Sequence, residues 1–369
     1  MIYLDYAANT PVDEEVLDSF VKATRKFIAN PNSLHPLGKM AKDAIDRVSE
    51  DIAKYFHTNK ESVIYTSGSS ESNNLVIKGI AEIRKNLGNK IIISAVEHSS
   101  IVAPCNYLAS LGYDVSVIPL TKEGIVDLEE LKREIDNQTI LVSICTVDSE
   151  LGTIQPISKI SEIVKEYSNA VFHTDATQAI GKVDIDYTGV DFISFGPHKF
   201  YGLNGFGVLL NVNNTKLNPL IHGGKSTTIF RSGTPVTANV IALGKAFQLA
   251  TSKFNERANY IKKLNMELRN EFKKLDYVHI NSPENAIPNT LNISLINKDT
   301  KSILKKLEEN EIYLSTTTAC ALGSSPSKSV LAITGSEELA SNTLRISISH
   351  LTSEDDIKEF LRIFKRVSK

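Results

Sequence analysis

Hydrophobic positions in the first 250 residues alternate between short β-branched runs and longer segments with helical spacing. The expected strands are residues 62–66, 90–94, 114–118, 140–146, 170–174, 191–195 and 207–211. Helices are expected at 38–56, where apolar residues recur every three or four positions, at 67–88 and around 100–111. Strands that alternate with helices are typical of an α/β domain with a largely parallel sheet.

The pattern changes beyond about residue 250. Charged helical segments at 257–275 and 300–309 flank short strand-like runs at 290–295 and 343–347. The chain has 369 residues, more than the roughly 250–300 that one hydrophobic core usually supports. We therefore expect a large α/β domain and a second, smaller α+β domain.

Composition and charge narrow the class of protein. Apolar residues make up 41% and charged residues 23%, as in ordinary globular proteins, and the net charge is −2. This charge argues against nucleic acid or an anionic membrane as the main partner. No apolar run approaches the roughly 18 residues of a membrane span, and the acidic start has no signal-like core. We expect a cytoplasmic protein. The 3 cysteines and 8 histidines show no ligand spacing, so no metal is assigned.

Residues 191–205, DFISFGPHKFYGLNG, place Lys199 just past the end of a strand, in a turn rich in glycine. A lysine there can point its amine into a cleft, where its chemistry is chiefly Schiff-base formation, usually with pyridoxal phosphate (PLP). Taken alone, a solvated surface lysine is the commoner case. The remaining segments favour the cofactor.

Two further segments suit anions. Ser69 and Ser70 belong to TSGSS, residues 66–70, between a strand and a helix, where amides, hydroxyls and the helix dipole favour a phosphate. A serine-rich helix cap explains the same residues without a ligand. The polar loop from 221–224 to 231–234, HGG followed by RSGT, is also suited to anions.

Polar residues near two other strand ends suit a PLP ring. Asp175 ends a hydrophobic strand, where a carboxylate is costly unless paired, and a protonated pyridine nitrogen is such a partner. Gln178 follows three residues later and could donate to the ring hydroxyl. His98 follows the strand KIIIS and could stack on the ring and move protons; a packed core histidine is the alternative.

A loop of small residues at 315–325 carries Cys320 with no apolar surroundings. A thiol on such a loop is available to attack a substrate or to pass on sulfur. Cys145, within a hydrophobic strand, and Cys105, within a helix, are instead expected to be packed residues. Cys320 is therefore the candidate nucleophile.

Together these segments closely resemble the cysteine desulfurases, PLP enzymes of the class V aminotransferase group. The resemblance runs from Leu4-Asp5 to Thr352 and includes Asn30–His35, Thr66–Asn74, Glu97-His98, Gly152–Pro156, Asp175–Gln178, His198–Gly202, Ile221–Gly224, Arg231–Thr234, Ala319-Cys320 and Leu344–Ser347. It implies PLP-dependent transferase fold type I. Residues 13–250 would form the large PLP-binding domain with a mainly parallel seven-stranded sheet. Residues 1–12 and 251–369 would form the small α+β domain with the cysteine loop.

The resemblance also implies roles for matching residues. Lys199 would hold PLP and serve as acid and base, and the cofactor would further be held by Ser69, Ser70, His98, Ser149, Asp175, Gln178 and His198, with Thr234 reaching it from the other subunit of a homodimer. Arg345 and Asn32 would bind the substrate, L-cysteine. Cys320 would take its sulfur as a persulfide and release alanine. The acceptor would be an iron–sulfur scaffold or a tRNA-thiolation protein.

The chain also departs from the family pattern. Tyr6 and Ser149 stand where the family usually has asparagine, and Gly196 stands where it has a phosphate-binding serine. Thr316, Thr317 and Thr318 replace a segment that contains glycine, so the cysteine loop should be stiffer. These departures indicate a divergent member of the family, whose substrate preference or sulfur acceptor could differ.

Two alternatives are open. A β-eliminating cysteine or selenocysteine lyase, or an aminotransferase, would use Lys199 in the same way without needing the Cys320 thiol. A non-catalytic sulfur-relay or scaffold-binding protein would keep the fold and lose the cofactor. A Cys320→Ser variant separates the first alternative, and a PLP absorbance band lost in Lys199→Ala excludes the second.

Overall fold

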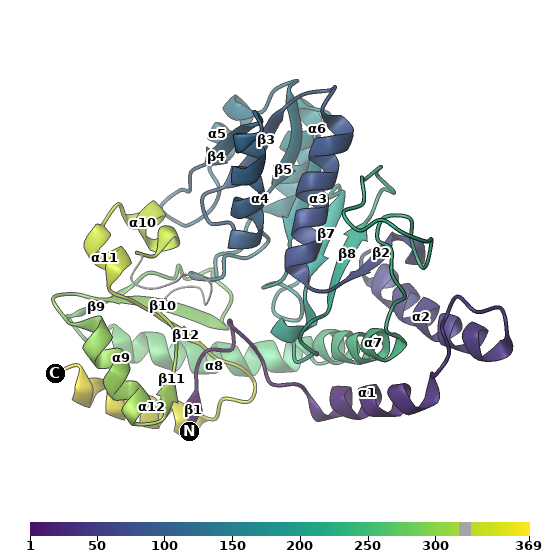
Figure 1. The fold of residues 1–369 in the computed structure, drawn as a ribbon. Helices are drawn as coiled ribbons and strands as arrows, with labels where there is room; N and C mark the ends of the chain where they lie inside the picture. The colour runs from purple at the N-terminus through teal and green to yellow at the C-terminus, as the bar shows by residue number, and fades with distance from the viewer. Residues whose placement is uncertain (317–325) are drawn as a thin grey trace.

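A seven-stranded sheet forms the centre of the computed structural model, which describes residues 1–316 and 326–369 (Figure 1). The strands, in the order β2-β8-β7-β6-β5-β3-β4, are β2 (Val63–Thr66), β8 (Gly207–Asn211), β7 (Phe192–Phe195), β6 (Val171–Asp175), β5 (Thr139–Ser143), β3 (Lys90–Ser94) and β4 (Asp114–Ile118). Strands β7, β6, β5, β3 and β4 are mutually parallel, and β8 is antiparallel to both of its neighbours. The predicted mainly parallel seven-stranded sheet is confirmed.

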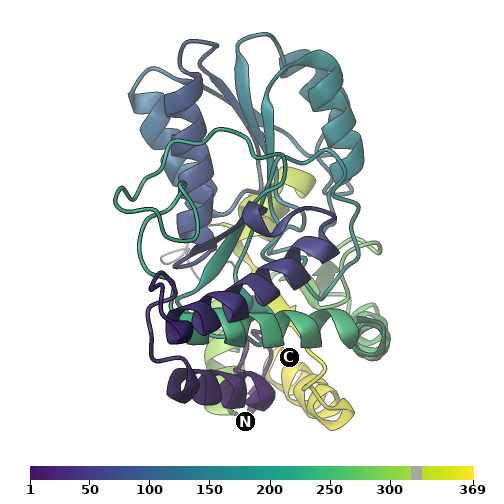
Figure 2. The same cartoon turned by 90° about the vertical axis from the view of Figure 1, so that its right-hand side faces the viewer.

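Helices cover both faces of this sheet (Figures 1 and 2). They are α1 (Glu14–Lys26), α2 (Pro36–Tyr55), α3 (Ser69–Arg84), α4 (Ser99–Ser110), α5 (Leu128–Glu134), α6 (Ile157–Tyr167) and α7 (Thr237–Ser252), with the 3-10 turn η1 (Lys60–Ser62) before β2. Neighbouring residues of one strand serve opposite faces: Leu141 packs in the cluster with α3 and α4, and Val142 in the cluster with α2, α6 and α7. Burial on both faces explains why β3, β5, β7 and β8 are mostly apolar, whereas the edge strand β4 is partly exposed.

The C-terminal part builds a separate hydrophobic cluster together with the first strand. Its elements are β1 (Ile2–Tyr3), α8 (Phe254–Phe272), β9 (Val278–Ile280), β10 (Thr290–Leu295), α9 (Thr300–Glu309), β11 (Ile312–Tyr313), α10 (Lys328–Thr334), α11 (Glu337–Ser341), β12 (Thr343–Ser347) and α12 (Glu354–Val367). Strands β12, β10 and β9 form an antiparallel sheet, and β1 pairs in parallel with β11. Leu4 lies in this cluster with Phe272 and Phe360, all three fully buried.

The division into residues 13–250 and residues 1–12 with 251–369 stays our proposal, and the separate hydrophobic clusters support it. The N-terminal strand belongs to the C-terminal cluster through its pairing with β11 and through a bridge between Asp5 and Ser347. Both chain termini accordingly lie at the same end of the molecule (Figures 1 and 2). None of the helices within residues 1–316 and 326–369 is long and apolar enough to cross a membrane.

Candidate active site

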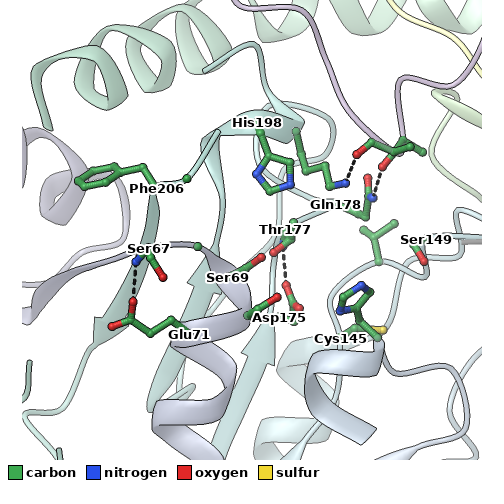
Figure 3. Close-up of a pocket in the computed structure, with 18 of the residues that line it drawn as sticks. Ser67, Ser69, Glu71, Cys145, Ser149, Asp175, Thr177, Gln178, His198 and Phe206 are labelled. Carbon is green, nitrogen blue, oxygen red and sulfur yellow. Dashed lines mark hydrogen bonds between the residues drawn. The ribbon is translucent and has the colours of Figure 1, made fainter. Parts of the chain in front are cut away.

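A cavity of about 410 Å³ lies beyond the carboxyl ends of β3, β5, β6 and β7 (Figure 3). This edge of an open parallel sheet is where ligands usually bind, and the volume is within the usual range for a small-molecule site. The cavity brings together most of the residues singled out in the sequence: Ser69, Ser70, His98, Ser149, Asp175, Gln178, His198, Lys199 and Arg345. They come from six different segments of the chain, which only the fold makes neighbours.

Asp175 is the last residue of β6, and its side chain lines the cavity while the residue is only 7% exposed. One carboxylate oxygen accepts a hydrogen bond from the Asn73 side-chain amide at 2.8 Å, and the other accepts from the Thr177 backbone N–H at 2.9 Å (Figure 3). These two donors fix the orientation of the carboxylate. A buried carboxylate at the wall of a cavity is suited to a cationic ligand atom.

Lys199 ends a short 3-10 turn, η2 (Pro197–Lys199), directly after β7. Its amine lines the cavity and donates to the carbonyl of Ala8, and Gln178 donates to the carbonyl of Ala7 at 2.9 Å (Figure 3). The N-terminal segment therefore forms part of the cavity wall. Lys182 donates to the Gln178 side-chain oxygen at 2.6 Å, which settles that the Gln178 amide nitrogen faces Ala7. Burial, with the nearby Lys199 charge second, lowers the pKa of Lys182 to about 7.

Ser69 and Ser70 are the first two residues of α3, so the positive end of a 16-residue helix faces the cavity. Gly207 lies against Gly68, where any side chain would overlap the backbone. At Gly196 a Cβ atom would lie 2.9 Å from Cε1 of His198. A serine at position 196 would therefore require the His198 ring to shift. Burial, followed by the Lys199 charge, lowers the pKa of His198 to about 4.

Arg345, in β12, reaches the cavity from the C-terminal part of the chain and is 1% exposed. Its guanidinium forms an ion pair with Asp5 at 2.9 Å and donates to the Ser149 backbone carbonyl at 3.3 Å. Among the described residues, its Nε atom has no hydrogen-bond partner. The guanidinium is a buried cation at the cavity wall, as expected for a group that binds a carboxylate.

His98 follows β3 and lines the cavity, with Glu97 buried behind it. Burial lowers the pKa of His98, and the negative charge of Asp175 opposes this effect. Burial raises the pKa of Glu97 to about 8, although Glu97 accepts hydrogen bonds from Ser94 and from the Cys145 backbone. Burial therefore favours the neutral form of both side chains.

Several predicted residues are not brought into the cavity. Asn32 is exposed and donates to the Ser226 hydroxyl at 3.0 Å, and Thr234 is exposed on the loop before α7. Cys320 lies outside the described residues. Cys105 is a buried helix residue, as predicted. Cys145 is also buried but belongs to the segment after β5, since that strand ends at Ser143, and it lines the cavity.

Sequence patterns alone missed other cavity residues. Thr177 lines the cavity, and its buried hydroxyl has no hydrogen-bond partner in the part of the chain that the structure describes. Asn73 is completely buried behind Asp175. Asn73 lies within the segment TSGSSESNN, yet nothing local to that segment indicates a contact with a residue 102 positions away.

The donor set fits PLP. The cavity combines a lysine amine, a buried carboxylate for a pyridinium nitrogen, and a helix N-terminus with two serines for a phosphate. The unpartnered Thr177 hydroxyl adds a hydrogen-bonding group that calls for a polar ligand atom. Among the described residues there is no group of three or more potential metal ligands.

Comparisons with known proteins agree with this class of site. Residues 2–360 match the family model described as aminotransferase class-V. The cysteine desulfurase IscS of Dictyoglomus turgidum is 38% identical, over 99% of this chain and 94% of that protein. The protein of the same name from Clostridium botulinum is 37% identical, over 100% of this chain and 94% of its own length.

Solved structures are similar as well. A NifS-like protein matches with a TM-score of 0.93 and 32% identity, over 100% of this chain and 99% of that one. A structure described as SspA in complex with cysteine matches with a TM-score of 0.83 and 32% identity, over 96% of this chain and 100% of that one. The chain therefore belongs to the aminotransferase class-V family, in which its relatives are cysteine desulfurases.

Proposed function

We propose that this protein is a PLP-dependent cysteine desulfurase, which converts L-cysteine to L-alanine and passes the sulfur on as a persulfide of Cys320. The observation that carries the proposal is the cavity in which Lys199, Asp175 and Arg345 converge at the carboxyl edge of the sheet. Relatives named cysteine desulfurase, similar over almost the whole chain, support the choice of reaction.

When bound, PLP withdraws electrons from the α-carbon of an amino acid. Lys199 is the group that takes up and returns protons, because its amine projects into the cavity. Asp175 would pair with the pyridine nitrogen, and the N-terminus of α3 with Ser69 and Ser70 would bind the phosphate.

The substrate side of the cavity is formed by the C-terminal part of the chain. Arg345 would bind the substrate carboxylate through its guanidinium, and Asp5 and Ser149 would hold that group in place. The Ser149 side chain lines the cavity and supplies one hydroxyl where the family usually has an amide. Asn32 is exposed in the single chain. It would therefore contact bound substrate only if a second subunit packs against this surface.

The sulfur step balances without an added redox partner. The S–H of Cys320 and the C–S bond of L-cysteine are exchanged for an S–S bond and a C–H bond, giving L-alanine and a Cys320 persulfide. The persulfide then passes its outer sulfur to an acceptor, such as an iron–sulfur scaffold or a tRNA-thiolation protein.

We also propose a cytoplasmic homodimer in which Thr234 of each subunit binds the phosphate in the other. Thr234 is exposed, and the surrounding segments expose large apolar residues. The most exposed of these are Ile28, Leu34, Ile229 and Val236. Burial of such residues between two copies would supply the driving force for dimerisation. Sedimentation of the PLP-loaded protein should give twice the mass of one chain.

Product analysis tests the reaction. The PLP-loaded protein is incubated with L-cysteine and a reductant, and we expect alanine and sulfide in equal amounts. The Cys320→Ser variant should bind PLP normally and lose both products. Pyruvate and ammonia in place of alanine would identify β-elimination, and unchanged alanine formation by Cys320→Ser would contradict the role of the thiol.

A further inference from the structure

A continuous network of buried side chains connects His98 with Asp175 behind the cavity. Asn73, which is fully buried, donates from Nδ2 both to Asp175 at 2.8 Å and to the Ser100 hydroxyl at 2.8 Å. Ser100 in turn lies 2.8 Å from Nδ1 of His98. A second branch leads from the Asn73 oxygen to the Ser194 hydroxyl and on to His173 at 3.0 Å.

The proton positions in this network follow from one fixed point. The Asp175 carboxylate can only accept, so the amide nitrogen of Asn73 must face it and the amide oxygen must face Ser194. The Ser100 oxygen accepts from that amide nitrogen, which leaves the Ser100 hydroxyl proton for His98. The Asp175 carboxylate thus sets the bond directions as far as Ser100, and the Ser100 hydroxyl proton is available for His98.

A second, independent donor also points at the same histidine atom. His98 is the N-cap of α4, and its Nδ1 accepts the Ser100 backbone N–H at 3.2 Å. A proton on Nδ1 would face this N–H, so this contact requires Nδ1 to be an acceptor, and the Ser100 hydroxyl then donates to the same atom.

We propose that Ser100 is a positioning residue: with Asn73 it links His98 to Asp175 and holds Nδ1 of His98 as an acceptor, so that the neutral ring carries its proton on Nε2. The consequence for catalysis rests on the proposed function, because it concerns the histidine next to the bound cofactor. The same contacts hold the ring and the Asp175 carboxylate in fixed orientations on either side of Asn73. Three hydrogen bonds, between His98 and Ser100, between Ser100 and Asn73 and between Asn73 and Asp175, therefore connect the two side chains.

The charged groups around His98 do not replace this control. Asp175 on β6 favours a protonated ring, whereas Lys199 on η2 disfavours it. Burial also favours the neutral forms of His198, on the same turn, and of Glu97. The two donors at Nδ1 therefore work with burial against protonation of His98.

Nuclear magnetic resonance of protein labelled with ¹⁵N-histidine tests the proposal in the PLP-free and PLP-loaded full chain. The His98 signals are assigned by their loss in His98→Gln. We expect the Nε2–H form in the native protein. In Ser100→Ala we expect the proton dissociation constant of His98 to fall roughly 2- to 10-fold, as for the loss of one net hydrogen bond to the neutral ring. Ser99→Ala, at the exposed neighbouring position, is the matched control and should titrate like the native protein.

An Nδ1–H form in the native protein, or identical titration of all three proteins, would overturn the proposal. Alanine is well suited to position 100 in a helix, so Ser100→Ala should fold. Asn73→Ser is a second variant, whose shorter side chain should lose the hydrogen bond to the Ser100 hydroxyl. The titration needs neither PLP nor L-cysteine. Failure of the proposed reaction would therefore appear as missing alanine with this titration unchanged.

Discussion

The Asp175→Asn substitution would remove the negative charge of the cavity wall and keep the side-chain shape. In the structure, each Asp175 oxygen accepts one donor, from Asn73 at 2.8 Å and from the Thr177 backbone at 2.9 Å. An asparagine has one oxygen, so in either orientation one of these donors faces an NH₂ group. A buried donor left unpaired costs about 1–3 kcal/mol of folding stability.

The effect on PLP adds to this cost. A hydrogen bond to a charged group contributes about 1.5–3 kcal/mol, so its loss at the pyridine nitrogen should weaken PLP binding roughly 10- to 150-fold. Turnover should fall further, since the protonated ring is the stronger electron sink. Titration of the PLP-free protein with PLP, followed by absorbance, gives the affinity, and urea unfolding gives the stability.

The chain contains a matched control for this experiment. Asp191 also accepts one backbone N–H and one asparagine amide, from Phe172 and from Asn213, both at 2.9 Å, but it does not line the cavity. Asn213 is exposed, so Asp191→Asn should lose less stability than Asp175→Asn, and it should keep native PLP affinity. Equal PLP affinity in Asp175→Asn and the native protein, or an equal loss in both variants, would refute the assignment of Asp175.

Three other predictions address separate parts of the cavity. Lys199→Ala should lose the absorbance band of bound PLP and all turnover while keeping its unfolding midpoint; a retained band would contradict the assignment. Arg345→Lys should raise KM for L-cysteine about 10-fold or more, because one ammonium cannot reproduce the forked contacts with Asp5 and a carboxylate, and PLP affinity should stay the same. The folded-state pKa of Glu97, about 8, lies above its ordinary value of 4.5, so its stabilising contribution is present at low pH and is lost as pH rises through that window. Glu97→Gln should remove this part of the pH dependence in urea unfolding; an unchanged slope would show that Glu97 is ionised in the native state.

Local patterns predicted most strands because the central sheet is buried on both faces. Runs such as 90–94, 114–118 and 207–211 are strands with the predicted bounds. The predicted strand 140–146 extends three residues beyond the C-terminal end of β5, Thr139–Ser143. The ladder ends at Ser143, although Ile144 and Thr146 still donate to carbonyls of β6. Ile144 and Cys145 follow the strand and are also hydrophobic, because they are buried. Hydrophobicity alone could therefore not locate the end of the strand.

The candidate site was predictable where its chemistry lies at strand ends. Asp175, His98 and Lys199 each follow a recognisable strand, and parallel strands bring their carboxyl ends to one edge. The supporting contacts were not predictable, because they join distant residues. Arg345 pairs with Asp5 340 positions away, and no local pattern in either segment indicates the other.

The space around the phosphate end shows a second limit of sequence reasoning. Gly196 suggested that a phosphate-binding hydroxyl had simply been lost. In the structure the His198 ring lies within 2.9 Å of the position that a Cβ atom at residue 196 would take. The absence of a side chain at Gly196 thus leaves room for the His198 ring in its present position, a contact that only the folded chain reveals.

Mass spectrometry after a single turnover tests the central claim most directly. The PLP-loaded protein is mixed with one equivalent of L-cysteine without reductant, digested, and its cysteine peptides are compared with the alanine formed. We expect one added sulfur atom on the Cys320 peptide, none on the Cys105 and Cys145 peptides, and an equal amount of alanine. Alanine with no sulfur on Cys320, or added sulfur on Cys145, would contradict that claim.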